Sequence, residues 1–401
     1  MFSSLLRSLP QLGRRWKPLT FANPNFVRLP EEYKIEEETL PEYNASEFYP
    51  TRIGEIIKER YQVIGKLGFG STSTAWLARD MEKRRYVMLT VYIQASSMGR
   101  HADDELNMYK HMGQITTSHP GQDVVRALLD TFNIDGPKGQ HRCLVHVPLW
   151  ESVLAYLRRN PVERLPSAVI AVVLHRLFLA LDYLHTECQI AHTDIKADNI
   201  MFGIKDDSVF TEFEKYEIER PVPRKEVDAD GRMIYMSQEL NIPKKVGAPV
   251  LCDFGSAMLG DQPHSVADIW NVGCMIWDIY EGGSLFRGQD PEFERYRSRA
   301  HLAENINLLG PPPCSLLTQG QLRDKFFSKQ GKHFPYDLTM YYAVSAFDPV
   351  PLEQRETTLE GRAEREAFLR FMRKMLQWEP SQRSSAKELA EDEWILSHMG
   401  R

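Results

Sequence analysis

The sequence predicts an α+β fold with two lobes, in which a small β-rich half precedes a larger helical half. Runs rich in β-branched and aromatic residues dominate the chain between Tyr61 and Val147. Apolar stretches with helical spacing follow from Ser152 onward. The chain has 401 residues, of which 42% are hydrophobic and 26% charged, and this is enough to build two lobes with buried cores.

In the first half, strand patterns alternate with turn residues. The predicted strands are Tyr61–Leu67, Thr74–Ala78, Tyr86–Ile93 and Cys143–Val147. Gly68-Phe69-Gly70 separates the first two strands, and a charged turn at 80–85 separates the second from the third. A helix is expected over Asp103–Met112, because apolar residues recur there at helical spacing.

The second half contains several helix patterns. Ser167–Leu184 and Ser265–Tyr280 are strongly apolar, and both are expected to be buried helices. A late helix has an apolar face made by Phe368, Phe371, Met372, Met375 and Leu376. Ser385–Glu388 fits a capping box that opens the final helix. Residues 203–249 are charged and turn-rich, and they form an insertion that is either a surface excursion or partly disordered.

Composition excludes several classes of protein. A net charge of −6 argues against direct binding of nucleic acid and permits basic partners. No apolar run reaches the length of a membrane span, because His175 and Arg176 interrupt the longest one, Ala168–Ala180. The five cysteines are scattered, without a C-x-x-C pair, which indicates a reducing compartment and neither a disulfide framework nor a zinc site.

Residues 1–45 form an extension that is first basic and then acidic. No Asp or Glu occurs before Glu31, and apolar residues between Phe2 and Leu12 fall roughly on one helical face. This composition fits a mitochondrial transit segment, and the alternative is a disordered basic tail with a docking helix. We expect a cytoplasmic or nuclear protein, and the basic N-terminus makes the mitochondrion the alternative location.

Two polar motifs in the helical half lie at a specific spacing. The first is His192-Thr193-Asp194-Ile195-Lys196-Ala197-Asp198-Asn199, and the second, Asp253-Phe254-Gly255, begins 54 residues after the first one ends. A D-F-G tripeptide alone is frequent by chance. Both motifs in this order, after a glycine-rich turn between strands, resemble the catalytic loop and metal site of protein kinases.

Each polar residue of these motifs has an expected role in phosphoryl transfer. Asp194 is expected to accept or orient the proton of the substrate hydroxyl, and Lys196 to neutralise charge on the transferring group. Asn199 and Asp253 are the predicted magnesium ligands. The alternative for Asp194 is a turn or helix-capping aspartate, and His192 is expected to be a packed structural histidine.

The turn Gly68-Phe69-Gly70 is the candidate phosphate loop. Glycines allow backbone amides to approach phosphates closely, although Ser73 stands where a third glycine is expected. A G-x-G between strands is otherwise more often an ordinary hairpin. The motifs downstream favour the phosphate loop.

Three segments resemble the SR-protein kinase family, in its fungal-type branch. They are Tyr61–Asp80, His192-Thr193-Asp194 with threonine in place of the usual arginine, and Ala267–Gly273. The resemblance covers roughly residues 45–397. It implies a bilobal protein kinase fold, with an N-lobe and hinge at 46–149 and a C-lobe at 150–397 that carries the insertion. It also implies a serine/threonine kinase that uses ATP and Mg²⁺ to phosphorylate arginine/serine-rich proteins.

The resemblance also assigns nucleotide contacts by position. It places Glu105 as the helix glutamate, Cys143–Leu149 as the hinge strand and His146 as the gatekeeper. The Val147 carbonyl and the Leu149 amide would contact adenine. The full set of expected ATP-binding residues is Leu67, Gly68, Gly70, Ala75, Thr90, Glu105, Val147 and Leu149.

The first departure from the family is the strand that should read V-A-x-K. It reads Val87-Met88-Leu89-Thr90, so that Thr90 stands where a lysine should pair with the phosphates and with Glu105. Losing such a donor typically costs about 10²–10³ in rate. Glu105 is expected to lose its partner, and Thr90→Lys is expected to restore nucleotide affinity. Lys66 is the nearest candidate for a substitute.

The second departure is a short segment after the D-F-G motif. Only 12 residues separate Gly255 from Asp268, and no A-P-E motif lies among them. Arg383, which the resemblance pairs with the glutamate of that motif, is expected to lack its partner. A pseudokinase that lost the segment and a skipped exon explain this equally well.

Three functions therefore remain open: an active kinase, a pseudokinase that acts as a scaffold, and a nucleotide sensor. The acidic residues Asp290, Glu292 and Glu294 are either a docking site for arginine-rich substrates or a solvated surface. The sequence does not indicate an oligomeric state.

Overall fold

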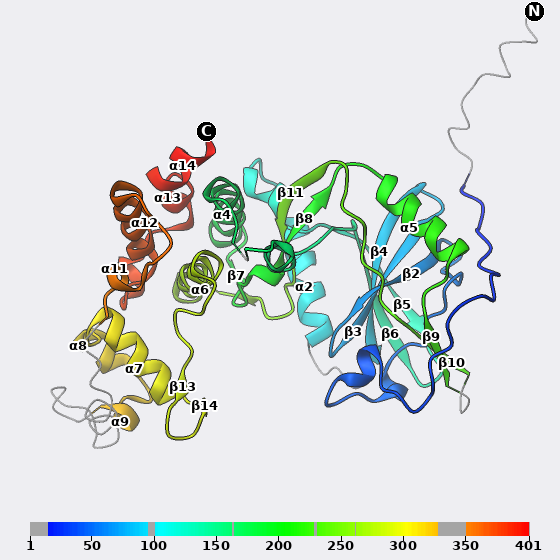
Figure 1. Ribbon diagram of the computed structural model, residues 1–401, viewed down its shortest axis with the longest axis horizontal. Helices are drawn as coiled ribbons and strands as arrows, with labels where there is room; N and C mark the ends of the chain where they lie inside the picture. Colours follow the sequence, from blue (N-terminus) through cyan, green and yellow to red (C-terminus); the bar gives the residue numbers. More distant parts are fainter. Residues whose placement is uncertain are drawn as a thin grey trace, which may run out of the picture. The chain divides into compact units, whose positions relative to one another are not determined.

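The computed structural model describes residues 15–94, 101–162, 164–227, 231–260, 262–327 and 350–400. The apolar positions between Phe2 and Leu12 lie outside the described residues. The chain forms two compact units (Figure 1). Unit 1 comprises residues 1–109, 126–150 and 202–248, and unit 2 comprises residues 110–125, 151–201 and 249–401.

Unit 1 is built on a six-stranded sheet in the order β1-β2-β3-β4-β6-β5, and every neighbouring pair is antiparallel. The strands are β1 (Ile56–Ile57), β2 (Tyr61–Phe69), β3 (Ser73–Asp80), β4 (Arg85–Gln94), β5 (Leu128–Asp135) and β6 (Gln140–His146). The four strands predicted from the sequence are confirmed as β2, β3, β4 and β6, whereas β1 and β5 were not expected.

Side chains of β4 point alternately to the two faces of this sheet. Along β4, Val87, Leu89 and Val91 are buried in the main apolar cluster of the unit. The residues between them therefore point to the opposite face, because side chains alternate along a strand. The predicted helix is confirmed as α2 (His101–Gln114), and its Leu106 and Met112 are buried.

The N-terminal segment and the insertion also belong to unit 1. Residues 15–48 contain two short 3₁₀ helices, η2 (Glu36–Thr39) and η3 (Ala45–Glu47). The insertion, which the sequence analysis assigned to the helical half, groups with the sheet and forms α5 (Ser208–Glu219), β9 (Arg224–Val227) and β10 (Arg232–Tyr235). Figure 1 shows the N-terminal segment in dark blue beside β9 and β10, where the Leu29 amide donates to the Arg224 carbonyl.

Unit 2 is mainly helical. Its longer helices are α4 (Ser167–Asp182), α6 (Gln262–Glu281), α7 (Ser298–Leu309) and α12 (Arg362–Met375). Its shorter helices are η4 (Pro120–Val124), α3 (Val153–Arg159), η5 (Tyr183–Glu187), η6 (Ala197–Asn199), α8 (Cys314–Gln319), α9 (Arg323–Phe326), α11 (Leu352–Arg355), η7 (Pro380–Gln382), α13 (Ala386–Ala390) and α14 (Glu393–Met399). The short strands are β7 (Ile190–Ala191), β12 (Met258–Leu259), β13 (Gln289–Asp290) and β14 (Arg295–Tyr296), and β8 (Ile200–Ile204) pairs with β11 (Val246–Leu251).

The helix patterns of the second half are confirmed in unit 2. In α4 the apolar residues are largely buried, so this helix forms the core of the unit. The stretch Ser167–Glu187 is long and apolar enough to cross a membrane, but most of it lies inside the structure, as in the core helix of a soluble protein. The apolar face of α12 is buried, and Ser385 and Glu388 form the predicted capping box.

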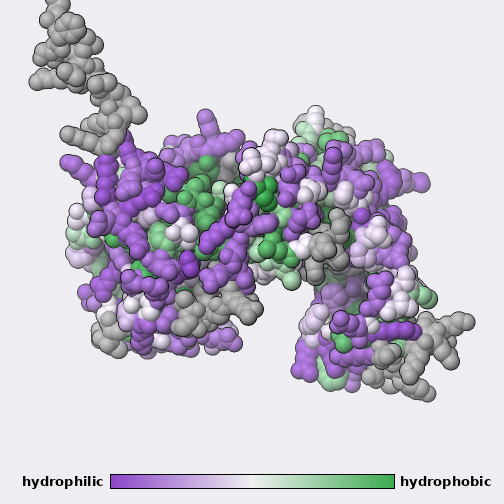
Figure 2. Space-filling view, turned by 180° about the vertical axis from the view of Figure 1, so that it is seen from behind, coloured by the Kyte–Doolittle hydropathy of each residue, from purple (hydrophilic) through white to green (hydrophobic). Residues whose placement is uncertain are grey.

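The surface is consistent with the charged composition. On the face shown in Figure 2, hydrophilic residues predominate, and apolar residues form smaller patches between them. All five cysteines are free, and Cys143, Cys188 and Cys252 are buried.

Candidate functional site

The predicted catalytic loop lies in unit 2 and is anchored by a buried carboxylate. Asp268 of α6 accepts hydrogen bonds from the amides of His192 (2.8 Å) and Thr193 (2.7 Å), which fixes the start of the loop. The His192 ring is buried and lies 3.0 Å from the carbonyl oxygen of Cys252. His192 is therefore a packed structural histidine, as expected from the sequence.

Asp194 is held as a carboxylate by two neighbours. Lys196 Nζ donates to its Oδ2 at 2.6 Å, and the Asn199 side-chain amide donates to the same oxygen at 3.0 Å. Burial acts to raise the pKa of Asp194, but the bonds from Lys196 and Asn199 outweigh it and lower the pKa. Within the described part of the chain, Oδ1 of Asp194 has no hydrogen-bond partner, which leaves it for a substrate hydroxyl.

The two predicted metal ligands are brought together by the backbone. The amide of Cys252, next to Asp253, donates to the Asn199 carbonyl at 2.8 Å. Asp253 is exposed, with a φ of 66°, and the neighbouring Phe254 is fully buried. Because the Asn199 amide nitrogen faces Asp194, its oxygen remains for a cation. One carboxylate and one amide oxygen suit Mg²⁺, which protein sites commonly hold together with phosphate oxygens.

Three of the predicted nucleotide residues, Gly68, Ala75 and Thr90, lie in one row of the sheet. In the strand register Gly68 is opposite Ala75, and Ala75 is opposite Thr90. The space beside Gly68 is open, since a Cβ built there would meet no atom within 4 Å. The Gly70 amide donates to the Ser73 carbonyl at 2.8 Å, which closes the turn after Leu67. The strands thus place these residues side by side.

Glu105 has a different partner from the one that the family uses. The hydroxyl of Tyr92, two residues after Thr90 on the same face of β4, donates to Glu105 Oε2. Both side chains are buried. Glu105 therefore has no lysine partner from position 90, and the Tyr92 hydroxyl, which was not expected, contacts it instead. No motif signals Tyr92, and only the alternation along β4 would have placed it on this face.

Lys66 cannot substitute for the missing lysine in this structure. Its side chain is 0% exposed, and Nζ is paired with Glu37 and, at 3.3 Å, with Glu36. It also donates to the carbonyl of Tyr235 at 3.3 Å. The Lys66 ammonium group is therefore paired with the N-terminal segment. The alternative that Lys66 contacts the nucleotide phosphates was wrong.

An arginine side chain that was not expected from the sequence contacts the predicted hinge. The Arg126 guanidinium donates to the Val147 carbonyl (3.4 Å) and contacts Met88 Sδ (3.0 Å). The Val147 carbonyl is the group that the resemblance assigns to adenine, whereas the side chain of Leu149 is buried. Sequence reasoning missed Arg126, because it lies 21 residues before Val147 and belongs to no motif.

His146, the expected gatekeeper, is a neutral residue. Its side chain is buried, and Nδ1 lies 3.1 Å from the carbonyl oxygen of Ala127. Burial, together with the neighbouring Arg126 charge, lowers the pKa of His146 to about 3. The ring of Tyr109 lies 5.2 Å away, between centroids.

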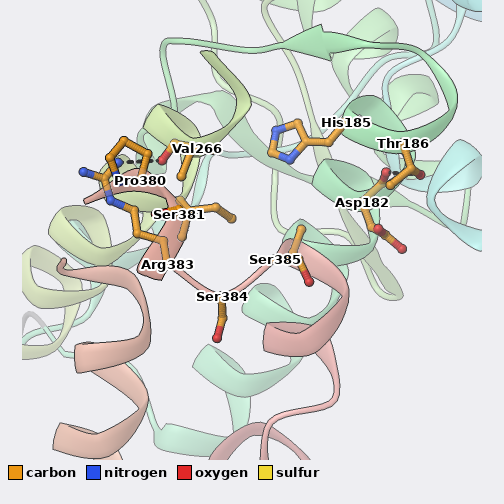
Figure 3. Close-up of a pocket in the computed structure, with 11 residues that line it drawn as sticks. Asp182, His185, Thr186, Val266, Pro380, Ser381, Arg383, Ser384 and Ser385 are labelled. Atoms are coloured by element: carbon orange, nitrogen blue, oxygen red, sulfur yellow. Dashed lines mark hydrogen bonds between the residues drawn. The ribbon is translucent and has the colours of Figure 1, made fainter. Parts of the chain in front are cut away.

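The short segment after Gly255 leads almost directly into α6, which begins at Gln262. Arg383 Nη1 donates to the Val266 carbonyl at 2.9 Å, a bond drawn in Figure 3, and Nε donates to the Gln377 carbonyl at 2.9 Å. The guanidinium also lies 5.0 Å from the ring centroid of Trp270. Arg383 therefore donates to backbone carbonyls, and among the described residues no carboxylate pairs with it in place of the missing glutamate.

A cavity of about 210 Å³ lies beside Arg383. Figure 3 shows Arg383 and Val266 on one side of it and Asp182, His185 and Thr186 on the other. His185 Nε2 lies 2.9 Å from Asp268, so the wall of this cavity is continuous with the anchor of the catalytic loop.

The acidic residues considered for substrate docking are largely used within the chain. Asp290 is 0% exposed and accepts a hydrogen bond from Arg299 Nε at 2.5 Å. Arg299 Nη2 donates to Glu292 at 2.7 Å. Asp290 and Glu292 thus share one internal arginine, and of the three acids Glu294 alone has no ion pair within the described residues.

Comparison with known proteins gives relatives along almost the whole chain. A serine/threonine protein kinase of Aspergillus fumigatus is 37% identical over 404 residues, covering 95% of this chain and 95% of that protein. The serine/threonine-protein kinase SRPK of Physarum polycephalum is 26% identical over 405 residues, covering 90% and 92% of the two chains. SRSF protein kinase 3 of Mus musculus is 34% identical over 171 residues, which cover 43% of this chain and 30% of that one.

A crystal structure of a kinase domain matches with a TM-score of 0.61 and 19% identity, covering 87% of this chain and 98% of that one. This likeness shows the bilobal kinase fold expected from the sequence. No protein-family model matches the chain. The full-length fungal relative and the SRPK relative agree with the motifs described above, and the chain therefore belongs to the SR-protein kinase-like family of serine/threonine protein kinases.

Proposed function

We propose that this chain transfers the terminal phosphoryl group of ATP to serine or threonine residues of arginine/serine-rich proteins. The observation that carries the proposal is the state of Asp194. One of its carboxylate oxygens is fixed by Lys196 and Asn199, while the other has no partner among the described residues. This is the arrangement that a proton acceptor for a substrate hydroxyl requires.

Each residue of the set has a part in this proposal. Asp194 orients the hydroxyl and accepts its proton, and Lys196 carries a positive charge beside it. Asn199 and Asp253 would hold Mg²⁺. When bound, Mg-ATP supplies the transferable phosphoryl group. Thr90 offers only a short neutral hydroxyl, so we expect turnover to be about 10²–10³ slower than with a lysine at this position.

The substrate class is supported by relatives and by charge. The names of the relatives, SRPK and SRSF protein kinase, refer to kinases of SR proteins. A net charge of −6 favours the approach of basic chains. Because Asp290 and Glu292 are paired internally, docking at these two residues forms no part of the proposal.

The proposal is tested by phosphate transfer from labelled ATP to an arginine/serine-repeat peptide. A matched peptide with lysine in place of arginine tests the substrate class, and Asp253→Asn tests the metal ligand. We expect transfer to the arginine peptide, at least tenfold less to the lysine peptide, and loss of transfer in Asp253→Asn. Folded protein that transfers no phosphate to either peptide would contradict the proposal.

A second function is favoured by two observations. Arg126 donates to the carbonyl that adenine is expected to use, and Thr90 lacks a charge for the phosphates. Both features are expected to weaken nucleotide binding. A pseudokinase that binds nucleotide weakly and acts as a scaffold would show these features, and it would keep its cellular role in an Asp253→Asn variant.

The Arg126 contact gives a separate prediction. Replacing Arg126 by alanine frees the Val147 carbonyl, so Mg-ADP is expected to bind about tenfold more tightly, as for the loss of one competing charged hydrogen bond. Isothermal titration measures this, with Arg142→Ala as the control, because Arg142 is on β6 but pairs with Asp103. Unchanged or weaker binding in Arg126→Ala alone would show that Arg126 does not compete with adenine.

A further inference from the structure

We propose that Tyr92 is the positioning residue for Glu105, and that its phenol holds helix α2 in the place of the lysine that Thr90 replaces. The proposal rests on the proposed function, because it concerns the nucleotide site of that kinase. It assigns a role to a residue that belongs to none of the motifs. The contact that carries it joins the Tyr92 hydroxyl to Glu105 Oε2.

The strand geometry explains why Tyr92 reaches Glu105 and Thr90 does not. Thr90 and Tyr92 point to the same face of β4, about 6.7 Å apart along the strand. The threonine side chain ends at its γ atoms, whereas the tyrosine hydroxyl lies at the end of a rigid ring. Tyr92, with its longer side chain two residues further along the strand, therefore contacts Glu105 in place of the missing lysine.

An irregularity lies beside Tyr92 on the β6 side of β4. The pairing of β4 with β6 shifts between Val91 and Gln94, a bulge, whereas the pairing with β3 stays regular and puts Tyr92 opposite Ser73, so Tyr92 stays on the same face as Thr90. Inside this bulge the Tyr92 carbonyl lies 3.0 Å from His141 Nδ1. A carbonyl oxygen only accepts hydrogen bonds, so His141 carries its proton on Nδ1 and donates it.

The same bulge connects the glycine-rich turn to the helix. The amide of Ile93, next to Tyr92, donates to the Thr72 carbonyl at 2.9 Å, in the turn between β2 and β3. Ile93 thus ties the bulge to the turn after Gly70, and the neighbouring Tyr92 ties it to α2. We therefore expect Tyr92 to couple movement of α2 to this turn.

This arrangement changes the expectation for Thr90→Lys. A lysine at position 90 meets a Glu105 carboxylate that already accepts the Tyr92 hydroxyl. The single variant is therefore expected to change Mg-ADP affinity less than twofold. The variant that also carries Tyr92→Phe removes this hydroxyl from Glu105, and its affinity for Mg-ADP is expected to rise at least tenfold.

The test uses the full chain as wild type, Thr90→Lys, Tyr92→Phe and the double variant. Tyr86→Phe is the matched control, because Tyr86 lies on the same strand and its hydroxyl donates to a carboxylate of another helix, Glu214 in α5, at 3.2 Å. Hydrogen exchange of the α2 amides without nucleotide is the first readout. Mg-ADP affinity by titration is the second.

We expect exchange in α2 to be at least tenfold faster in Tyr92→Phe, unchanged in Tyr86→Phe and slow again in the double variant. Unchanged exchange in Tyr92→Phe, or equal affinity in Thr90→Lys and in the double variant, would overturn the role of Tyr92. If none of the proteins binds Mg-ADP, the proposed function fails, and the exchange pattern alone decides whether Tyr92 holds the helix.

Discussion

Removal of residues 1–45 is expected to destabilise unit 1 by several kcal/mol, although the sequence places the domain boundary after this extension. Glu36 and Glu37 pair with Lys66, and Glu38 pairs with Lys225 at 2.6 Å. Both lysine side chains are almost fully buried. A buried charge that loses its partner typically costs about 3–5 kcal/mol, and a chain starting at Ser46 leaves two such charges.

Chemical unfolding of chains that start at Arg15 and at Ser46 measures this effect. The chain from Arg15 keeps every contact that the described N-terminal segment makes, so it is the reference for the chain from Ser46. Replacing Lys66 and Lys225 by methionine in the chain from Ser46 is expected to recover part of the loss, since no buried charge then remains. Equal stability of the two truncated chains would refute the argument.

Asp194→Asn is expected to lower the rate of phosphate transfer by about 10²–10⁴, the usual contribution of a positioned general base. Asparagine keeps the size and the hydrogen-bonding shape of the side chain but has no carboxylate to accept a proton. Asp194 is only half-buried, so the free energy of unfolding is expected to change little. The measurements are initial rates with labelled ATP and a thermal unfolding curve.

Asp198→Asn is the matched control for this variant. Asp198 lies in the same loop and is exposed, and its contact is with Ser152 at 3.5 Å. It is expected to keep wild-type rates. Transfer that persists in Asp194→Asn would assign the activity to another residue or to a contaminating kinase, and an inactive Asp198→Asn would point to general damage to the loop.

The fold could be predicted where the residues of a single strand or helix show its apolar pattern. Strands β2, β3 and β4 have dense β-branched and aromatic runs, and α12 shows its apolar face in the sequence. Strand β5 was missed, because its sequence LLDTFNID mixes polar and apolar residues and most of it is only half-buried. It lies at the edge of the sheet, where less burial is required.

The catalytic and metal candidates were found in the sequence because their motifs fix both residue type and spacing. The residues that contact the candidate site residues lie far from them in the sequence, or are recognised only from the alternation of side chains along a strand. Lys66 pairs with residues 29 and 30 positions before it, and Arg126 reaches Val147 across 21 positions. Such pairs leave no periodic signal in the sequence, so the contacts of Lys66 and Arg126 could be found only in the structure.

The state of His146 has a consequence for small-molecule inhibitors. Because Nδ1 faces the Ala127 carbonyl, it carries the proton, and Nε2 presents a lone pair. With a pKa of about 3, the ring stays neutral over the physiological range. At the gatekeeper position that the resemblance assigns to His146, Nε2 would be a hydrogen-bond acceptor that an apolar residue does not offer, and physiological pH would not change it.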